Sequence, residues 1–228
     1  MKSLATAFGI AVTLGAYVLS RVVAKRYRSP LTTPVFFSTP IVICALLLSG
    51  FTVEHYQPAK DVMVFLLGPA TVALAVPLHE SRRALLNDLV AAVAGLTAGS
   101  LSTLVVAILL AKAFALPAVV RASIALKSVT APIAVELAPV VRGDPTLVAA
   151  FVITTGMIGA MFGPGLMDRA GIRSPLARGL ALGTISHGQG TAQAVGEGAL
   201  QGAAAGIAMG LAAVLTSLVA PVIVPLLL

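Results

Sequence analysis

The stretch ALKSVTAPIAVE, residues 125–136, places a lysine and hydroxyl side chains inside a long apolar run. An ammonium group at membrane depth costs roughly 2.5 to 3.5 kcal/mol on insertion scales, unless it pairs or faces a wet cavity. We therefore expect Lys127 to meet an anion, with Ser128 and Thr130 donating hydrogen bonds to its oxygens. The alternative is that Lys127 reaches a nearby interface while the hydroxyls cap a kink. We favour the first interpretation, because intramembrane charges generally mark functional sites.

Pro132 follows directly and indicates a change of backbone structure. Proline breaks an existing helix but suits the first position of a new one. We predict a helix break over 127–131 and a half-helix starting near Pro132. The free N–H groups and positive dipole end at such a start favour an anion. Glu136, one turn further on, could pair with Lys127.

A second polar stretch, GTISHGQGTAQAVGEG, occupies residues 183–198 and contains five glycines. Each glycine weakens a helix by roughly 1 kcal/mol relative to alanine. We predict a break over 186–191 and a half-helix beginning near Gly190, with backbone N–H groups forming an anion nest. A small-residue packing face would explain the glycines but not the histidine, which could bind a hydroxyl or carry a coupling proton. The candidate binding residues here are Ser186, His187, Gly188, Gly190 and Thr191.

A third candidate break lies at Gly68 and Pro69, in the stretch FLLGPATVALAVPL. No ionisable residue lies inside this stretch, so packing and function explain it equally well.

Catalysis and metal binding have little support in the sequence. No Ser-His-Asp set is discernible and no paired carboxylates share a segment. The single cysteine, Cys44, belongs to no Cys/His cluster with metal-ligand spacing. We therefore expect a protein that is not an enzyme, with neither a metal nor a cofactor.

The composition indicates which kind of secondary structure must position these residues. Of 228 residues, 58% are hydrophobic and only 10% are charged, against about 25% charged in soluble domains. The apolar runs are continuous and approach the roughly 20 residues that a membrane helix needs. We predict a single all-α domain over 1–228, a polytopic membrane protein with discontinuous or re-entrant helices. Such helices often occur in inverted repeats.

The net charge of +7 comes from lysines and arginines in short loops between apolar runs. That pattern orients membrane helices with basic loops on the cytoplasmic side, and no aromatic-interleaved basic patch indicates nucleic acid. We predict that loops 21–28, 82–83 and 169–178 are cytoplasmic. The third loop reaches that side only if 118–141 is a re-entrant hairpin.

The motifs KSVTAPIA and SHGQGTA, together with FLLGPATVALAVPL, closely resemble the LrgB/CidB family of bacterial membrane proteins. The family reads Lys-Ser-Val-Thr, one residue, Pro-Ile-Ala, and later a His-Gly leading into Gly-Thr-Ala. The similarity covers nearly the whole chain. It implies a bacterial inner-membrane location and, for many members, a smaller membrane partner of the LrgA/CidA type.

The resemblance implies two different functions. One is transport of small carboxylates, because a related plastid envelope protein moves glycolate and glycerate, and bacterial relatives are linked to pyruvate. The other is antiholin-like regulation of murein hydrolase export and lysis. The residues favour transport of a glycolate, glycerate, lactate or pyruvate type of anion by alternating access, since a buried lysine and broken helices suit an anionic substrate. We also expect a homodimer embedded in the lipid bilayer.

Overall fold

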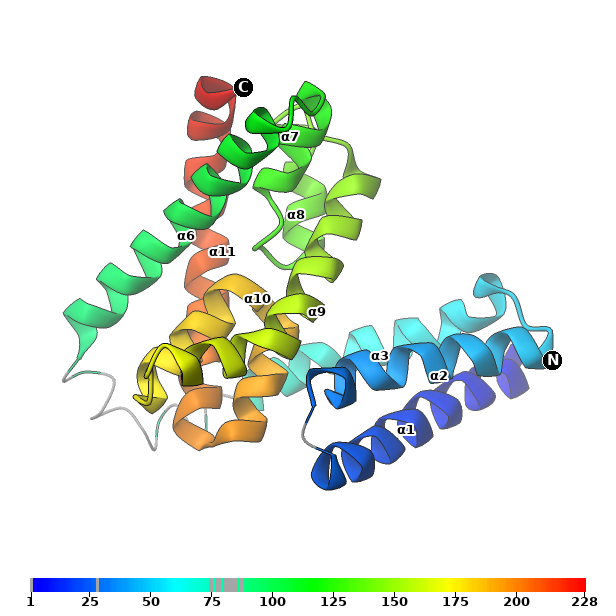
Figure 1. Cartoon of the computed structure of the whole chain (residues 1–228). Coiled ribbons are helices and arrows are strands. Elements are labelled where there is room, and N and C mark those ends of the chain that lie inside the picture. Colours follow the sequence, from blue (N-terminus) through cyan, green and yellow to red (C-terminus); the bar gives the residue numbers. More distant parts are fainter. Residues whose placement is uncertain (1, 28, 74–75, 77–78, 80–85, 87) are drawn as a thin grey trace. The chain divides into compact units, whose positions relative to one another are not determined.

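A computed structural model describes residues 2–27, 29–73, 76, 79, 86 and 88–228. The chain divides into two compact units, Met1–Ala73 and Leu74–Leu228, which are both drawn in Figure 1. The described residues form helices and turns and no strand, which confirms the all-α prediction. Organisation as one domain over 1–228 stays a prediction. The basic loop at 82–83 lies outside the described residues.

The first unit contains α1 (Lys2–Arg26), a short 3-10 turn η1 (Pro30–Thr32), α2 (Pro34–Ser49) and α3 (Val53–Ala73). Helix α1 packs against both α2 and α3. Thr13 shares a 2.8 Å hydrogen bond with the hydroxyl of Tyr56, which fixes the contact between α1 and α3.

The break predicted at Gly68 and Pro69 is wrong, because α3 runs through both residues to Ala73. A proline removes only one backbone hydrogen bond, and membrane helices tolerate it where their surroundings compensate. The Gly-Pro pair alone is therefore insufficient to end this helix.

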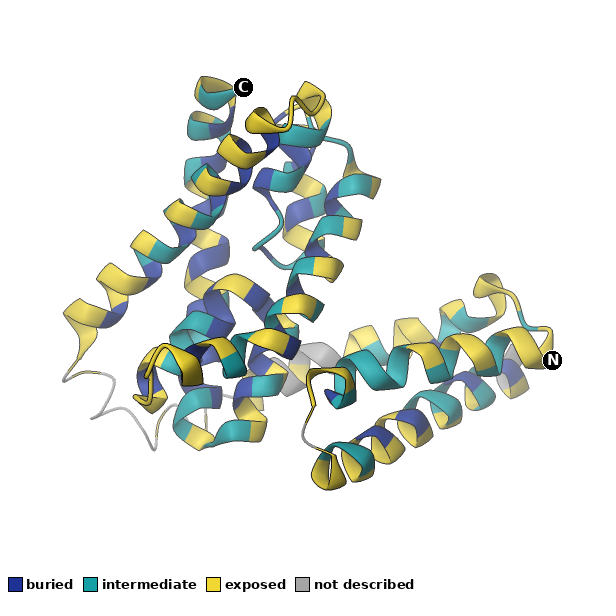
Figure 2. Cartoon of the chain, viewed as in Figure 1, coloured by how far each residue is buried: buried dark blue, intermediate teal, exposed yellow. Residues whose placement is uncertain are grey.

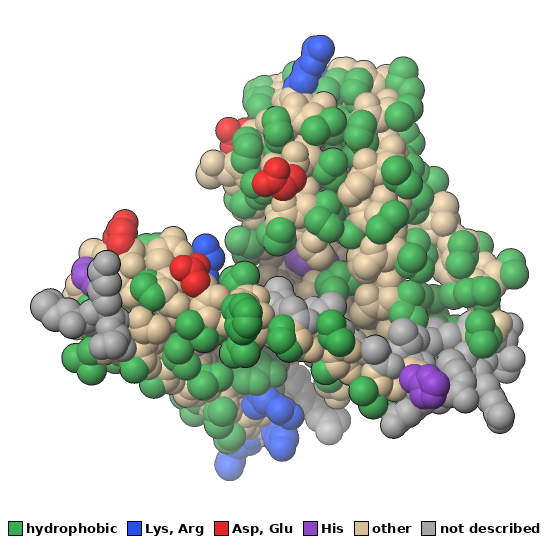
Figure 3. All heavy atoms as spheres, turned by 180° about the vertical axis from the view of Figure 1, so that it is seen from behind, with side chains coloured by type: hydrophobic (Ala, Val, Ile, Leu, Met, Phe, Trp, Pro, Cys, Tyr) green, Lys and Arg blue, Asp and Glu red, His purple; other side chains and the backbone are tan. Residues whose placement is uncertain are grey.

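The second unit is built on three long helices, α6 (Leu89–Ala113), α9 (Pro145–Arg169) and α11 (Ala199–Leu227). These three and Leu4–Arg26 of α1 are long enough and apolar enough to cross a membrane. At about 1.5 Å per residue, each exceeds the roughly 30 Å of a bilayer core. Figure 2 shows buried, intermediate and exposed residues alternating along these helices. Hydrophobic side chains cover much of the surface in Figure 3, as a lipid-facing protein requires.

A first hairpin lies between α6 and α9. It consists of α7 (Ala118–Ala125) and α8 (Ala131–Leu137), which are both far too short to cross a membrane. At its base, Ser123 Oγ accepts a 2.9 Å hydrogen bond from the backbone N–H of Asp144. The chain therefore returns to the end of the unit where it entered, which is the re-entrant geometry predicted for 118–141.

A second hairpin is formed by α10 (Pro175–Glu197) alone. Its helix is interrupted at His187, whose φ of 40° and ψ of −127° are not helical. A Cβ at Gly190 would collide with the carbonyl oxygen of Leu182, so the chain reverses sharply here. At the base, Arg178 forms an ion pair with Glu197, and the two ends of α10 therefore lie together.

The two hairpins enter the unit from opposite ends of α9. The first base lies at Asp144, which caps the start of α9, and the second lies beside Asp168, near its end. Figure 1 shows α7 and α8 towards one end of this unit and α10 towards the other.

The buried core follows the same division along the three long helices. One cluster joins the first hairpin to residues such as Ile108, Val148 and Val224. Another joins Leu182 of the second hairpin to Met167 and Ala205. The long helices thus form a frame that holds one hairpin in each half.

Candidate functional site

Both predicted breaks occur, and they lie near each other. The first occupies the turn between α7 and α8, which carries Lys127, and α8 begins at Ala131 beside Pro132 as predicted. The second is centred on His187. Leu126 and Val129, on either side of this lysine in the turn, pack in one buried cluster with Val152 of α9, whose carbonyl oxygen lies 3.0 Å from His187 Nε2. Two breaks about 60 residues apart in the sequence therefore contribute to one place inside the second unit.

Lys127 is half-buried, and its ammonium donates a 3.1 Å hydrogen bond to Ser128 Oγ. An ammonium carries three protons, so it retains capacity to donate to a ligand. Thr130 stands at the N-cap of α8 in an extended conformation, and its side chain makes no capping hydrogen bond. The cation and both hydroxyls of this turn are therefore still able to bind further groups.

The prediction that Glu136 pairs with Lys127 is wrong. Glu136 lies in α8 and is exposed, and the described residues contain no ion pair between it and Lys127. The extended Thr130 separates the lysine from α8, so the two side chains are not on consecutive turns of one helix. Lys127 thus has no carboxylate partner among these residues.

His187 is buried at the tip of the second hairpin, with 6% of its surface exposed. Its Nε2 lies 3.0 Å from the carbonyl oxygen of Val152 in α9. Since a carbonyl only accepts, Nε2 must carry the proton and donate, which leaves Nδ1 as an acceptor in the neutral ring. A non-glycine residue with this backbone conformation costs on the order of 1–3 kcal/mol, so the surrounding contacts must hold it.

Glycines on α9 make room for this tip. A Cβ at Gly156 would lie 2.5 Å from His187 Cε1 and 3.0 Å from Gln189 Oε1. One turn along, a Cβ at Gly159 would overlap the side chain of Ser186. The predicted residue Ser186 is thus buried against α9. The sequence analysis missed Gly156, although the repeated glycines in ITTGMIGAMFGPG mark a face suited to close packing.

The remaining predicted residues have distinct local roles. Thr191 donates a 2.9 Å hydrogen bond from its hydroxyl to the carbonyl oxygen of His187, at the break. Gly190 fits closely against the backbone of the preceding half-helix. Gly188, by contrast, is exposed and has open space where a Cβ would stand. A ligand can therefore approach the backbone at Gly188.

Gln189 is a residue of the tip that sequence analysis did not select. Its Oε1 is buried and has no hydrogen-bond partner among the described residues. A buried acceptor without a donor is costly, by about 1–3 kcal/mol. It therefore marks a position where a donor from outside the described residues would be stabilised.

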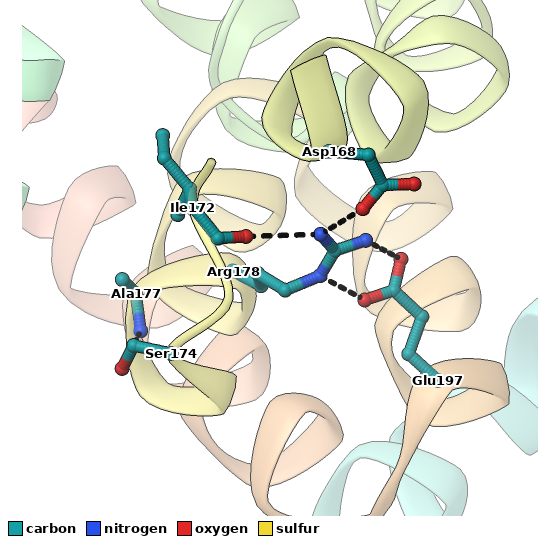
Figure 4. Close-up of polar contacts among 6 residues, drawn as sticks. All are labelled: Asp168, Ile172, Ser174, Ala177, Arg178 and Glu197. Carbon is teal, nitrogen blue, oxygen red and sulfur yellow. Dashed lines mark hydrogen bonds and ion pairs between the residues drawn. The ribbon is translucent and has the colours of Figure 1, made fainter. Parts of the chain in front are cut away.

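The base of the second hairpin is held by a network around Arg178, drawn in Figure 4. Its guanidinium donates to both oxygens of Glu197, at 2.7 and 3.1 Å, in a bidentate pair. It also donates to Asp168 at 2.6 Å and to the carbonyl oxygen of Ile172 at 3.1 Å. The arginine predicted as part of a cytoplasmic basic loop thus links both ends of α10 to α9.

Comparison with known proteins shows which family the chain resembles over most of its length. The model of the LrgB-like family matches residues 13–226. YxaC of Bacillus subtilis is 33% identical and spans 84% of this chain and 83% of that protein. The antiholin-like protein LrgB of B. subtilis is 31% identical, over 82% of each chain.

The holin-like protein CidB of Staphylococcus epidermidis is 29% identical, over 82% of this chain and 81% of its own length. No solved structure matches. The holin-like relatives and the apolar helices together support a membrane protein. With nearly its whole length matched by the family model, the chain belongs to the LrgB-like family.

Proposed function

We propose that this protein transports small carboxylate anions across the membrane through the site between the two hairpins. The proposal depends above all on one observation: Lys127 is half-buried without a carboxylate partner, in a turn that packs on Val152 beside the broken helix at His187. A charge held at membrane depth needs a counter-charge or water. A small anion that enters and leaves would supply that counter-charge.

The groups around Lys127 match a carboxylate in number and kind. The ammonium neutralises the charge, while Ser128 and Thr130 offer hydroxyl donors to its oxygens. Gly188 allows the backbone of the second tip to approach the same ligand. The described residues carry no cluster of His, Cys, Asp or Glu that could hold a metal ion, and the proposed mechanism uses none. It is binding and release without covalent chemistry, so we propose no enzyme activity.

The hairpin arrangement supplies a means of alternating access. Secondary transporters commonly bind near the midplane between discontinuous helices and expose the site to one side at a time. Here each hairpin has its base at an opposite end of α9. Movement of either hairpin against the long helices would open the site towards a different side. We propose the side of loops 21–28 and 169–178 as cytoplasmic, from their basic residues.

The direct test is uptake of labelled glycolate, lactate and pyruvate into proteoliposomes containing the purified chain. We expect uptake with wild type and a loss of at least about 100-fold with Lys127→Ala, because removing one partner of a desolvated charge pair costs about 3 kcal/mol or more. Lys112→Ala is the matched control, since this exposed lysine ends α6. Uptake that is absent from wild type would overturn the proposal.

A second function is favoured by the relatives' names. Proteins called holin-like CidB and antiholin-like LrgB match about four-fifths of this chain. As a second candidate function, we propose that the protein regulates murein hydrolase export and lysis, together with a partner of the LrgA/CidA type. This regulation would follow from altered anion flux if Lys127→Ala changed lysis and uptake together. A lysis phenotype that survives Lys127→Ala would instead favour a regulator independent of transport.

A further inference from the structure

The end of α1 carries a group of basic side chains that the proposed transport does not use. Arg21, Lys25 and Arg26 are all exposed, and none of them forms an ion pair among the described residues. We call these three residues the basic end of α1. Figure 3 shows a group of Lys and Arg side chains at one edge of this unit, with no Asp or Glu side chain visible beside it.

The acidic residues of the first unit lie away from this charge. The unit contains only two carboxylate side chains, Glu54 and Asp61, and both belong to α3. Ala59 of α3 lies against the first half of α1, since a Cβ at Gly9 would be 2.8 Å from the Cβ of Ala59. Arg21 lies about 18 Å further along α1 than Gly9. An anion that neutralises the basic end must therefore come from outside this unit.

The basic end continues a face of α1 that is otherwise apolar and exposed. Leu14, Val18 and Val22 follow one another at a spacing of four residues, and all three are exposed. Arg21 and Lys25 each come three residues after one of these valines, so the five side chains share one side of the helix. A hydrocarbon chain packed along this stripe would bring its headgroup to the two cations.

Tyr27 indicates the level of the membrane surface at this end of α1. Tyrosine is enriched where hydrocarbon meets headgroups, because its ring is apolar and its hydroxyl is polar. The side chain is exposed, and Arg26 Cζ lies 5.9 Å from the centroid of its ring in a cation–π contact. The basic end therefore lies at headgroup depth, where the phosphate groups of lipids are found.

We propose that the basic end of α1 binds the phosphate of an anionic phospholipid, whose hydrocarbon chains lie along Leu14, Val18 and Val22. Guanidinium groups donate in pairs to phosphate oxygens, and an ammonium adds a compact positive charge. A zwitterionic lipid carries its own cationic group, which offsets the attraction. Basic loops also orient membrane helices, but orientation depends on the number of basic residues and not on the face that they share. The face shared with the apolar stripe favours a lipid over a soluble anion.

The experiment measures displacement of a phosphatidylglycerol with a fluorescent label on its chain from the purified full-length protein in detergent micelles. Unlabelled phosphatidylglycerol should displace the label at a concentration at least about tenfold lower than phosphatidylcholine requires. Inorganic phosphate has the charge but no hydrocarbon chain, so it should not displace the label. This arm separates a lipid site from a site for free phosphate.

Removing two charges from the basic end tests where the lipid binds. Arg21→Gln combined with Lys25→Gln should weaken phosphatidylglycerol binding at least about tenfold. The matched control, Lys60→Gln combined with Lys112→Gln, removes the same charge from two other exposed positions and should change the affinity by less than about twofold. If the first double variant does not fold, Lys25→Gln alone should still weaken binding about threefold.

Three outcomes would overturn the proposal. Equal displacement by the two phospholipids would leave the basic end with a role in helix orientation alone. Equal losses in the two double variants would show that net charge, and not this face of α1, attracts the lipid. Displacement by inorganic phosphate as strong as that by phosphatidylglycerol would assign the basic end to a soluble anion. None of these outcomes bears on the uptake of carboxylates, so the proposed function is tested separately.

Discussion

The two hairpins reach the same site by different structural means. The first uses a five-residue turn, 126–130, between two short helices. The second reverses α10 at the single residue His187. A wide turn can present several side chains, and here it supplies the cation and the hydroxyls. A tight reversal depends on the packing of neighbouring helices around it. Here it supplies a closely packed tip and the exposed backbone at Gly188. Charge and shape therefore come from separate hairpins.

The bases of the two hairpins also differ, in the kind of hydrogen bond that holds each of them. At the first base, Ser123 Oγ accepts one neutral hydrogen bond from Asp144 N at 2.9 Å, while its own proton is donated within α7 to Val119 O at 2.7 Å. Arg178 holds the second with a bidentate ion pair and two further contacts. Charge-assisted hydrogen bonds are about twice as strong as neutral ones. We infer that the second hairpin is the more firmly anchored and that the first moves more readily during transport.

The largest effect should come from filling the space that the second tip requires. Gly156→Val places a branched side chain where even a Cβ would lie 2.5 Å from the His187 ring. Overpacking of this kind should lower the free energy of unfolding in detergent by about 3 kcal/mol. Gly95→Val in α6 is the control, because a Cβ there meets nothing within 4 Å. Equal losses in the two variants would refute the close fit at the tip.

Breaking the base of the second hairpin should have the next largest effect. Arg178→Ala removes charge-assisted hydrogen bonds and leaves Glu197, with a side chain only 15% exposed, without its partner. We expect a loss of about 2 kcal/mol in the free energy of unfolding. Asp168→Asn should lose less than about 1 kcal/mol, because Asp168 is 68% exposed and its ion pair is solvent-screened. A larger loss of stability from Asp168→Asn than from Arg178→Ala would contradict this account of the network.

Breaking the base of the first hairpin should cost less stability than breaking the base of the second. Ser123→Ala leaves the backbone N–H of the half-buried Asp144 without its hydrogen bond. A neutral hydrogen bond of this kind contributes about 1 kcal/mol. Hydrogen exchange of the amide of Asp144 should quicken in the variant while that of α11 stays unchanged. A destabilisation exceeding that of Arg178→Ala would contradict the proposed difference between the hairpins.

The smallest effect is expected at Glu136, which sequence analysis linked to Lys127. Its side chain is exposed and has no ion pair among the described residues. Glu136→Gln should change the free energy of unfolding by less than about 0.5 kcal/mol. Its anion uptake should match that of wild type, and a loss comparable to that of Lys127→Ala would restore the predicted pairing.

The sequence predicts the two breaks well because each has a local cause. Pro132 and a lysine within an apolar run, Lys127, define the first, and the glycines around His187 define the second. The basic loops also predict that 118–141 is re-entrant, since charge distribution governs topology.

Features that depend on contacts distant in the sequence could not be predicted. The reversal at His187 needs Gly156 on another helix, and its base needs Arg178 to meet Glu197, 19 residues away. The absence of a break at Pro69 likewise depends on surroundings that local propensity does not describe. Local chemistry thus identifies the hairpins, while packing between helices decides their form.

Access of water-soluble reagents to the second tip tests the central claim most directly. In a Cys44→Ala background, Gly188→Cys and Gly210→Cys each place a thiol at an exposed, open glycine, one at the tip and one on the apolar helix α11. We predict that a charged thiol reagent, applied to both membrane faces, modifies Gly188→Cys and that lactate slows this reaction. We further predict that Gly210→Cys stays unmodified in the lipid bilayer. Modification of Gly188→Cys no faster than of Gly210→Cys would contradict a water-reachable site between the hairpins.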